Sequence, residues 1–345
     1  MMQFLYRPPA PLQEDLLHLI FEHTSCPETL AYAALVCRAW VIPAQVALYK
    51  DIQYSPLTPC RKDALLARTL RSRPHLLRFV RRLSLVTLWT HSPTPELCDW
   101  IALIPMHHLR DFLWTWERGY LLSSFLSLPA LQTTRNIDLR GRLYTLTAVQ
   151  SILDLPHLEV LSLELSGDEQ GTLTCSPLKL QHLGVVAHGG YSSALDKLLG
   201  AVGHRIESLR ILSTFGEDPE GDSALVSCVL TQCVDLHSLD IAATSSPKPP
   251  FPAIETLIRQ YSSLKHLRCS TGAVPDIFGA MPPGLQHLRL PLTPSQVEPL
   301  LAYLKHETAS LFLRSLELIS GCDVDSQRIT KACRIHGVRL RLHCD

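Results

Sequence analysis

The chain lacks the residue patterns on which most enzymatic chemistry and metal binding depend. It contains no Gly-x-Ser-x-Gly nucleophile elbow, no Gly-x-x-x-x-Gly-Lys phosphate loop, no Gly-x-Gly-x-x-Gly dinucleotide motif and no His-Glu-x-x-His zinc motif. None of its eleven cysteines forms a Cys-x-x-Cys pair, and the nearest two, Cys228 and Cys233, have no second pair beside them. We therefore predict that the protein is not an enzyme and holds neither a metal nor a cofactor.

The chain also lacks a charge excess and a long apolar run. Lys+Arg and Asp+Glu both number 32, so the net charge is zero and no overall field draws the protein to nucleic acid or to an anionic membrane. The most apolar stretch, residues 31–49, is interrupted by Arg38, Pro43 and Gln45 and falls short of the ~20 apolar residues of a membrane span. A basic run over residues 61–82 alternates with leucines, which is typical of the solvated face of a helix.

Signals for secretion are missing as well. There is no Asn-x-Ser/Thr sequon, and residues 1–15 contain no basic segment followed by an apolar one. The cysteines are not spaced as in a disulfide-rich secreted domain. These absences predict a reduced compartment, the cytoplasm or the nucleus, and partners that include neither nucleic acid nor a membrane.

What the chain does contain is a recurring leucine pattern from residue 80 onwards. Its clearest copies are Leu158-x-x-Leu161-x-Leu163, Leu285-x-x-Leu288-x-Leu290 and Leu313-x-x-Leu316-x-Leu318. The central apolar positions, which are 21 to 30 residues apart, are Leu83, Phe112, Ile137, Leu161, Leu183, Leu209, Leu239, Leu267, Leu288, Leu316 and Leu340. Each copy pairs the period-two pattern of a strand with a stretch of helical periodicity. The pattern predicts an α/β leucine-rich-repeat solenoid whose parallel sheet has about eleven strands.

Helix starts are predicted between these strands at Thr94, Thr147 and Thr293, each a capping residue followed by a good first-turn residue. The asparagine that often follows the strand of a leucine-rich repeat is missing, because the whole chain has one asparagine, Asn136. The repeats therefore resemble the irregular ones of ubiquitin-ligase receptors and ribonuclease-inhibitor-like proteins.

Before the repeats, the sequence predicts three short helices within residues 12–52. The first carries a broad apolar face, the second opens with a capping box from Ser25 to Glu28 and continues through Trp40, and the third follows Pro43. We expect Ala34, Leu35 and Trp40 in the core of this module. About forty residues rarely bury enough apolar surface to be stable alone, so the module is expected to need a partner surface.

These helices resemble the F-box family, whose signature runs Leu-Pro-x-Glu, Ile-Phe, Val-Cys-Arg-x-Trp and a closing Leu-Trp or Leu-Tyr. The matching residues are Leu12, Asp15, Ile20, Phe21, Val36, Cys37, Arg38, Trp40, Leu48 and Tyr49. Gln13 stands where the family has proline, which removes a rigid helix entry, and Asp15 replaces the glutamate. We assign residues 8–54 to an F-box-like domain, 55–78 to a linker helix and 79–345 to the solenoid.

The resemblance implies a substrate receptor of an SCF-type, cullin-RING ubiquitin ligase. In that family the helices dock on the adaptor subunit, and through it on a cullin scaffold, while the repeats hold a protein substrate. The adaptor contacts that the resemblance implies are Leu12, Asp15, Leu16, Ile20, Phe21 and Val36. The alternative is a standalone interaction scaffold whose N-terminal helices only cap the solenoid, since every repeat array needs such a cap.

Strand residues beside the central leucine are expected on the uncovered inner face of the sheet. In the C-terminal half they are mainly basic, and the candidate substrate-binding residues are Arg210, His266, Arg268, His287, Arg289, Arg339 and Arg341. Such a face suits an acidic or phosphorylated segment, because guanidinium groups bind carboxylate and phosphate bidentately. A second interpretation is a self-satisfied ladder, because Asp240 and Glu317 interrupt the arginines. The cysteines at apolar positions, Cys37, Cys98, Cys228, Cys269 and Cys333, are expected to be buried packing residues.

Overall fold

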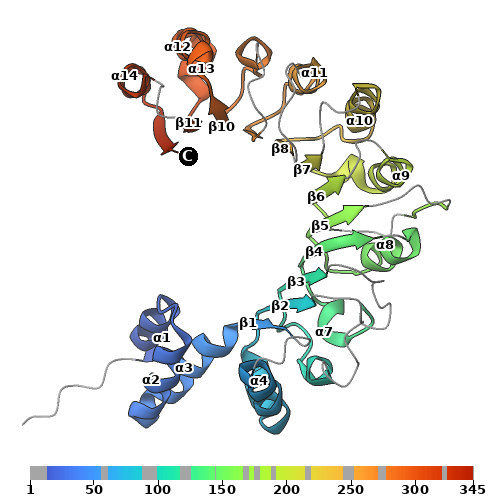
Figure 1. Cartoon of the computed structure of the whole chain (residues 1–345), viewed down its shortest axis with the longest axis vertical. Coiled ribbons are helices and arrows are strands. Elements are labelled where there is room, and N and C mark those ends of the chain that lie inside the picture. Colours follow the sequence, from blue (N-terminus) through green and yellow to red (C-terminus); the bar gives the residue numbers. More distant parts are fainter. Residues whose placement is uncertain are drawn as a thin grey trace, which may run out of the picture. The chain divides into compact units, whose positions relative to one another are not determined.

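The structure is a computed structural model that describes residues 14–55, 61–87, 99–116, 126–143, 145–165, 171–174, 179–187, 192–213, 219–243, 252–270, 277–320 and 325–344. Its described residues contain twelve strands, β1 to β12, of one parallel sheet whose strand order is the chain order (Figure 1). The predicted α/β class and parallel sheet are confirmed. The chain divides into two compact units, one ending at Thr134 and the other beginning at Arg135.

The first unit opens with three α-helices and continues with the first three strands. Its elements are α1 (Glu14–Glu22), α2 (Pro27–Val36), α3 (Arg38–Lys50), β1 (Asp51–Tyr54), α4 (Arg61–Ser72), the 3-10 helix η1 (Pro74–Phe79), β2 (Arg82–Thr87), η2 (Asp99–Leu103), β3 (Asp111–Trp116) and α7 (Pro129–Gln132). In α4, Arg68 and Arg71 are exposed while Ala67 and Leu70 are buried, which confirms the solvated basic face.

The second unit alternates strands and helices to the end of the described chain. Its elements are β4 (Asn136–Leu143), α8 (Leu146–Leu153), β5 (Val160–Leu165), β6 (His182–Ala187), α9 (Ser193–Val202), η3 (Gly203–Arg205), β7 (Ser208–Ser213), α10 (Pro219–Gln232), β8 (Ser238–Ala243), α11 (Pro252–Gln260), β9 (His266–Cys269), η4 (Ile277–Ala280), β10 (His287–Leu292), η5 (Pro294–Gln296), α12 (Val297–Lys305), α13 (Glu307–Phe312), β11 (Ser315–Ser320), α14 (Ser326–Ile335) and β12 (Arg339–Cys344). Within this unit the helices lie along one side of the sheet and leave the other side uncovered (Figure 1).

The strand register follows the leucine pattern. Phe112 pairs with Leu83 in the first unit, and in the second unit the central residues from Ile137 to Leu340 pair in one unbroken row. Their side chains face the helices, and Leu161 and Leu316 are fully buried. The predicted repeat register is therefore confirmed. The sequence pattern missed one strand, β1, in which Ile52 pairs with Leu83.

Helix starts agree only in part with the sequence predictions. Thr293 forms a capping box with Gln296, as the sequence indicated. The cap of α8 is Thr145 rather than Thr147, since the Thr145 hydroxyl oxygen accepts a hydrogen bond from the Ala148 amide at 3.3 Å. Thr94 lies outside the described residues.

The three N-terminal helices differ in their boundaries from the predicted ones. The expected capping box at Ser25 is absent, because α2 begins with Cys26 as its N-cap and no side chain caps it. Cys37 is extended, with φ −159° and ψ 165°, so α2 ends at Val36 and α3 already begins at Arg38 with Pro43 inside it.

The core of the helical module is small. Its buried residues are Leu17, Phe21, Leu30, Ala33 and Ala44, with Ala34, Trp40, Ala47 and Leu48 packed against them. Phe21 and Trp40 meet edge to face, with 5.4 Å between ring centroids. The expected core positions of Ala34 and Trp40 agree with this packing, whereas Leu35 is 81% exposed and its predicted core position is wrong.

Candidate protein-interaction surfaces

Two helices of the first unit each expose apolar side chains at helical spacing. In α1 these are Leu16, Leu19 and Ile20, and in α2 they are Tyr32, Leu35 and Val36, which we call together the exposed helix faces. Within each helix the positions are i, i+3 and i+4, so they lie on one side. Their exposed fractions run from 46% for Leu16 to 81% for Leu35. Large apolar side chains gathered on a surface in this way mark an interaction site.

The structure sorts the predicted adaptor contacts into three groups. Leu16, Ile20 and Val36 are exposed apolar residues and Asp15 is an exposed acid, as a contact surface requires. Leu12 lies outside the described residues.

Phe21 is 5% exposed and belongs to the module core, so its assignment to the surface is corrected. The reason is that the five apolar residues of α1 cover more than one side of the helix, and the side with Leu17 and Phe21 faces α3. The sequence prediction did not include Leu19 and Tyr32 among the contacts. Leu19 lies three residues after Leu16 and Tyr32 four residues before Val36, so helical spacing would have identified both.

The cysteine predictions have mixed outcomes. Cys228, Cys269 and Cys333 are buried, as expected, and burial raises the pKa of the Cys228 thiol to about 12, with a further contribution from its contact with Asp196. Cys37 is exposed because it lies in the extended link between α2 and α3, so its predicted burial is wrong. Cys98 lies outside the described residues.

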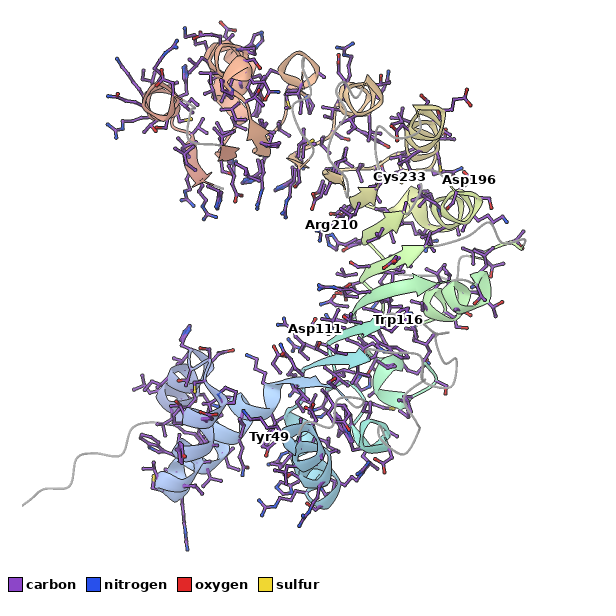
Figure 2. All side chains as sticks on the ribbon, viewed as in Figure 1. Tyr49, Asp111, Trp116, Asp196, Arg210 and Cys233 are labelled. Carbon is purple, nitrogen blue, oxygen red and sulfur yellow. The ribbon has the colours of Figure 1, made fainter. Side chains whose placement is uncertain are left out.

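The second surface is the uncovered side of the sheet in the second unit, which we call the inner face. Figure 2 shows Arg210 projecting from this side, whereas Asp196 and Cys233 lie on the helix side. Strand register arranges its side chains in rows across the strands. The first row contains Ser208, Ser238, His266, His287, Ser315 and Arg339. The second, which we call the charged row, contains Arg210, Asp240, Arg268, Arg289, Glu317 and Arg341.

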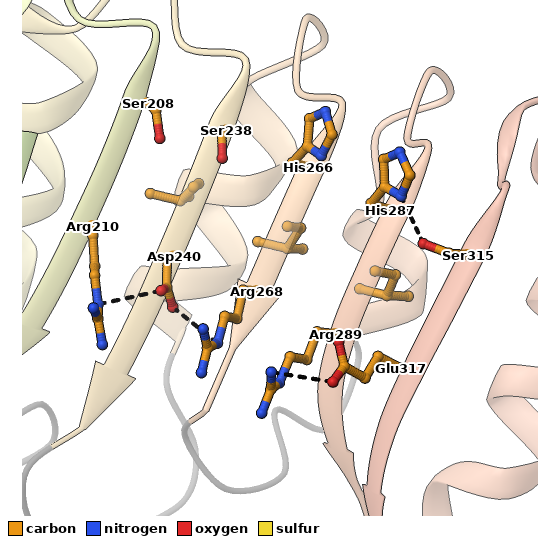
Figure 3. Close-up of a pocket in the computed structure, with 13 residues that line it drawn as sticks. Ser208, Arg210, Ser238, Asp240, His266, Arg268, His287, Arg289, Ser315 and Glu317 are labelled. Atoms are coloured by element: carbon orange, nitrogen blue, oxygen red, sulfur yellow. Dashed lines mark hydrogen bonds and ion pairs between the residues drawn. The ribbon is translucent and has the colours of Figure 1, made fainter. Parts of the chain in front are cut away.

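All seven predicted substrate-binding residues thus lie on one face of the sheet, on β7, β9, β10 and β12. Over β7 to β11 the two rows line an open hollow of about 460 Å³ (Figure 3). Its lining includes five of the seven; the remaining two, Arg339 and Arg341, lie on β12. The pattern of residues beside the central leucine therefore gave the correct side of the sheet.

Ion pairs satisfy part of the charged row. Arg210 Nε lies 3.3 Å from Asp240 Oδ2, and Arg268 Nε lies 3.7 Å from Asp240 Oδ1, so one carboxylate is shared by two guanidinium groups (Figure 3). Glu317 Oε1 is shared in the same way by Arg289 Nη1 at 3.2 Å and His343 Nε2 at 2.6 Å. The ladder interpretation is confirmed for these strands.

The ladder is incomplete where two arginines are neighbours. Arg268 and Arg289 pair in register on β9 and β10, with no carboxylate between them. The Nε atoms of both are buried and have no hydrogen-bond partner, since the 3.7 Å contact of Arg268 is too long for one. Four arginines against two acids leave the charged row with an excess charge of +2 (4 − 2).

Burial weakens the compensation further. Burial raises the pKa of the Asp240 carboxyl, although Arg268, Arg210 and Arg289 all act to lower it. The carboxylate therefore has less stabilisation than two adjacent guanidinium groups would ordinarily provide. An added anion beside Arg268 and Arg289 would meet two adjacent guanidinium groups whose side chains are 42% and 30% exposed.

Two histidines stack above this pair of arginines. The rings of His266 and His287 are 4.5 Å apart and 9° from parallel, and His287 Nδ1 lies 2.6 Å from Ser315 Oγ. Burial lowers the pKa of the His266 imidazole, with smaller contributions from His287 and Lys265. No carboxylate of the described chain contacts His287, so the His287–Ser315 pair lacks the third group that orients a catalytic histidine.

Other kinds of site find little support in the described ranges. No group of three or more His, Cys, Asp or Glu side chains there is arranged to hold a metal ion. Among the same residues, no helix combines the length and the apolar character needed to cross a bilayer. Comparison with known proteins found no match, either to a protein-family model or to a curated protein.

Proposed function

We propose that the protein is a substrate-recognition subunit of an SCF-type, cullin-RING E3 ubiquitin ligase. The helical module docks on the adaptor subunit and, through it, on a cullin scaffold, and the inner face of the repeats binds a protein substrate in the cytoplasm or nucleus. The chain needs no cofactor and performs no chemistry, because other subunits transfer ubiquitin. The family resemblance of residues 12–52 is the source of this proposal.

The exposed helix faces carry the adaptor half of the proposal. Leu35, Val36 and Tyr32 are each more than 60% exposed, although the module's core contains only five buried apolar residues, two of them alanines. At ~25 cal/mol per Å² of apolar surface removed from water, covering such side chains stabilises a complex by about 1–2 kcal/mol each. A module that exposes this much and buries so little gains stability from a bound partner.

The alternative is a standalone interaction scaffold, and one observation favours it. The segment that follows α3 forms β1, which pairs along its whole length with β2. In this alternative the helices cap the sheet edge and have no adaptor partner.

Co-purification of the full chain with the host's SCF adaptor separates the two functions. The test variant carries Leu16→Asp and Ile20→Asp, which place charges on the exposed side of α1. The matched control carries Leu311→Asp and Ile335→Asp, since these residues of α13 and α14 are also exposed, at 76% and 68%. Phe21 is left intact because it is a core residue.

We expect the adaptor to be recovered with the intact chain and with the control, and to be lost with the test variant. Circular dichroism checks that all three proteins are folded. If the intact chain recovers no adaptor, the scaffold function replaces the ligase function.

A further inference from the structure

The inner face has a third row, which follows the charged row along the strands and runs from Glu164 on β5 to His343 on β12. Between these two it contains the apolar residues Val186, Leu212, Ala242, Pro291 and Ile319. All five apolar residues are half-buried. A sheet face that only meets water usually alternates to polar side chains at such positions. Three adjacent strands, β6 to β8, instead present Val186, Leu212 and Ala242 side by side.

Small residues deepen the face next to this apolar row. On β5 and β6 the charged row is replaced by Ser162 and Gly184, which pair in register. Gly184 has no side chain to fill the space, and a Cβ there would lie 2.7 Å from Ser162 Oγ. Together with Val186 and Leu212 they line an open hollow of about 470 Å³. Its lining also contains the charged residues Asp138, Arg140, Glu164 and Arg210, of which Asp138 and Arg140 form an ion pair. We call it the apolar hollow after Val186 and Leu212.

Arg210 lines both the apolar hollow and the 460 Å³ hollow over β7 to β11, which we call the basic hollow. The two hollows are therefore continuous along the sheet. Arg268 and Arg289, whose Nε atoms have no hydrogen-bond partner, lie side by side in the basic hollow, on β9 and β10. The inner face thus offers an apolar point and an anion-binding point on a single surface.

We propose that the inner face binds an extended segment of a partner protein at these two points. An apolar side chain enters the apolar hollow between β6 and β7, and an anionic side chain lies between Arg268 and Arg289. The charge excess of +2 in the charged row and the apolar row beside it are complementary to such a segment. This inference rests on the substrate-binding half of the proposed function and names the kind of segment that is bound.

Strand geometry sets the distance between the two side chains. The point midway between β6 and β7 is three strand steps from the point midway between β9 and β10. Three steps span about 14 Å at ~4.8 Å per step. An extended chain advances ~3.4 Å per residue, so the two side chains are about four residues apart. An even separation is also what places both side chains on the same side of an extended chain.

The test uses peptide libraries and the purified full chain without any adaptor. Each peptide has a fixed central residue and five random residues on either side, and the central residue is phosphoserine, aspartate or serine in three parallel libraries. Retained peptides are sequenced, and the affinity of the best one is measured by fluorescence polarisation. We expect enrichment of apolar residues four positions from the centre, on one side only, with phosphoserine or aspartate but not with serine.

Substitutions test which residues bind the anionic side chain and which bind the apolar one. Arg268→Gln with Arg289→Gln is expected to weaken binding at least tenfold, whereas the charge-matched control Lys331→Gln with Arg334→Gln on the exposed side of α14 leaves it unchanged. Leu212→Gln is expected to abolish the apolar preference while the anion requirement remains, and Leu311→Gln is its control. Melting temperatures establish that each variant is folded.

Other outcomes overturn the inference. No enrichment in any library, equal binding of the serine library, or unchanged affinity of the double arginine variant would each do so. Equal or tighter binding of a single-stranded oligouridylate would assign the face to nucleic acid instead. Because the adaptor is absent, a negative result here leaves the adaptor experiment untouched, and the Leu16→Asp, Ile20→Asp variant should bind the peptide normally.

Discussion

Asp240 lies at the centre of the charged row, where its carboxylate is shared by Arg210 and Arg268. Both arginine side chains are more than 40% exposed, so neither ion pair contributes much to folding. Burial also raises the pKa of Asp240, because desolvation destabilises the charged carboxylate. The residue therefore mainly offsets the positive charge of the two arginines and adds little to the stability of the fold.

Replacing Asp240 by Asn tests this role. The free energy of unfolding is expected to change by less than about 1 kcal/mol. Affinity for the anionic peptide selected above is expected to rise about threefold to tenfold at low salt, since one unit charge at ~4 Å contributes ~1 kcal/mol in water. Urea unfolding and fluorescence polarisation measure the two quantities, and weaker binding of the variant would contradict the role.

His266 makes the stability of the folded chain depend on pH. Its pKa is lowered in the folded chain, so below the ordinary value of ~6.5 the unfolded chain binds more protons than the folded one. Its contribution to stability is therefore fully present above pH ~6.5 and is lost as the pH falls towards the lowered pKa. The decrease in unfolding free energy from pH 7 to pH 5 is expected to be smaller in His266→Gln. Urea titrations at the two pH values measure the free energy of unfolding. The same decrease in the variant as in the unaltered chain would refute this role of His266.

Phe21 and Ile20 are neighbours in sequence with opposite surroundings. Phe21 packs on Trp40 in a core of five residues, whereas Ile20 is 48% exposed. Phe21→Ala is expected to cost about 3–5 kcal/mol and to unfold the three helices, while Ile20→Ala costs less than ~0.5 kcal/mol. Urea unfolding followed by circular dichroism measures both. Equal losses for the two variants would show that the core has been assigned to the wrong side of α1.

The same pair shows where sequence reasoning stops. The leucine pattern placed the central residues of the sheet correctly, because alternation distinguishes the two sides of a strand. In α1, however, Leu16, Leu17, Leu19, Ile20 and Phe21 are all apolar, so periodicity alone does not show which side meets α3. The sequence also did not show that Arg268 and Arg289 lie side by side with no carboxylate between them. That arrangement depends on which arginine forms an ion pair with Asp240 and which with Glu317.

Among the helices, α9 and its continuation η3 contain two glycines with different surroundings. A Cβ on Gly203 would lie 2.9 Å from the Gln232 carbonyl oxygen at the end of α10, and a backbone group yields little. A Cβ on Gly200 would meet nothing within 4 Å. Close contact between successive repeats therefore depends on Gly203, whereas Gly200 only adds flexibility to the unfolded chain.

Alanine at each position gives opposite expected results. Gly203→Ala is expected to destabilise the protein by about 1–3 kcal/mol, because α9 and α10 must move apart. Gly200→Ala is expected to stabilise it by about 0.5–1 kcal/mol, since alanine is the better helix former. Thermal unfolding of both variants beside the unaltered chain is the measurement. A stabilising Gly203→Ala would mean that the two helices pack less closely than the structure has them.

Element boundaries were less predictable than element types. Thr145 and Thr147 are both capping residues two positions apart, and the choice depends on where β4 ends. Strand β1 was not predicted from the sequence because its four residues carry no leucine pattern and gain their pairing from β2. Proline at position 43 predicted a helix start, yet α3 tolerates it in its interior.

Across the chain, stability is expected to be uneven. Residues 14–50 depend on a core of five buried residues, while strands β4 to β11 of the second unit are anchored by a continuous row of buried residues from Ile137 to Leu316. Backbone hydrogen bonds that are covered by few apolar contacts open more readily. The N-terminal helices are thus the part of the chain that a bound partner would stabilise most.

Hydrogen exchange followed by mass spectrometry tests this difference at neutral pH. Amides of α1, α2 and α3 are expected to exchange at least tenfold faster than those of β5 to β8, because opening the helices breaks few buried contacts. If the adaptor covers the exposed helix faces, its addition slows exchange in α1 and α2 and leaves β5 to β8 unchanged. Equal protection of the helices and the strands in the free chain would show that the module is stable without a partner, which would remove the physical reason for expecting one.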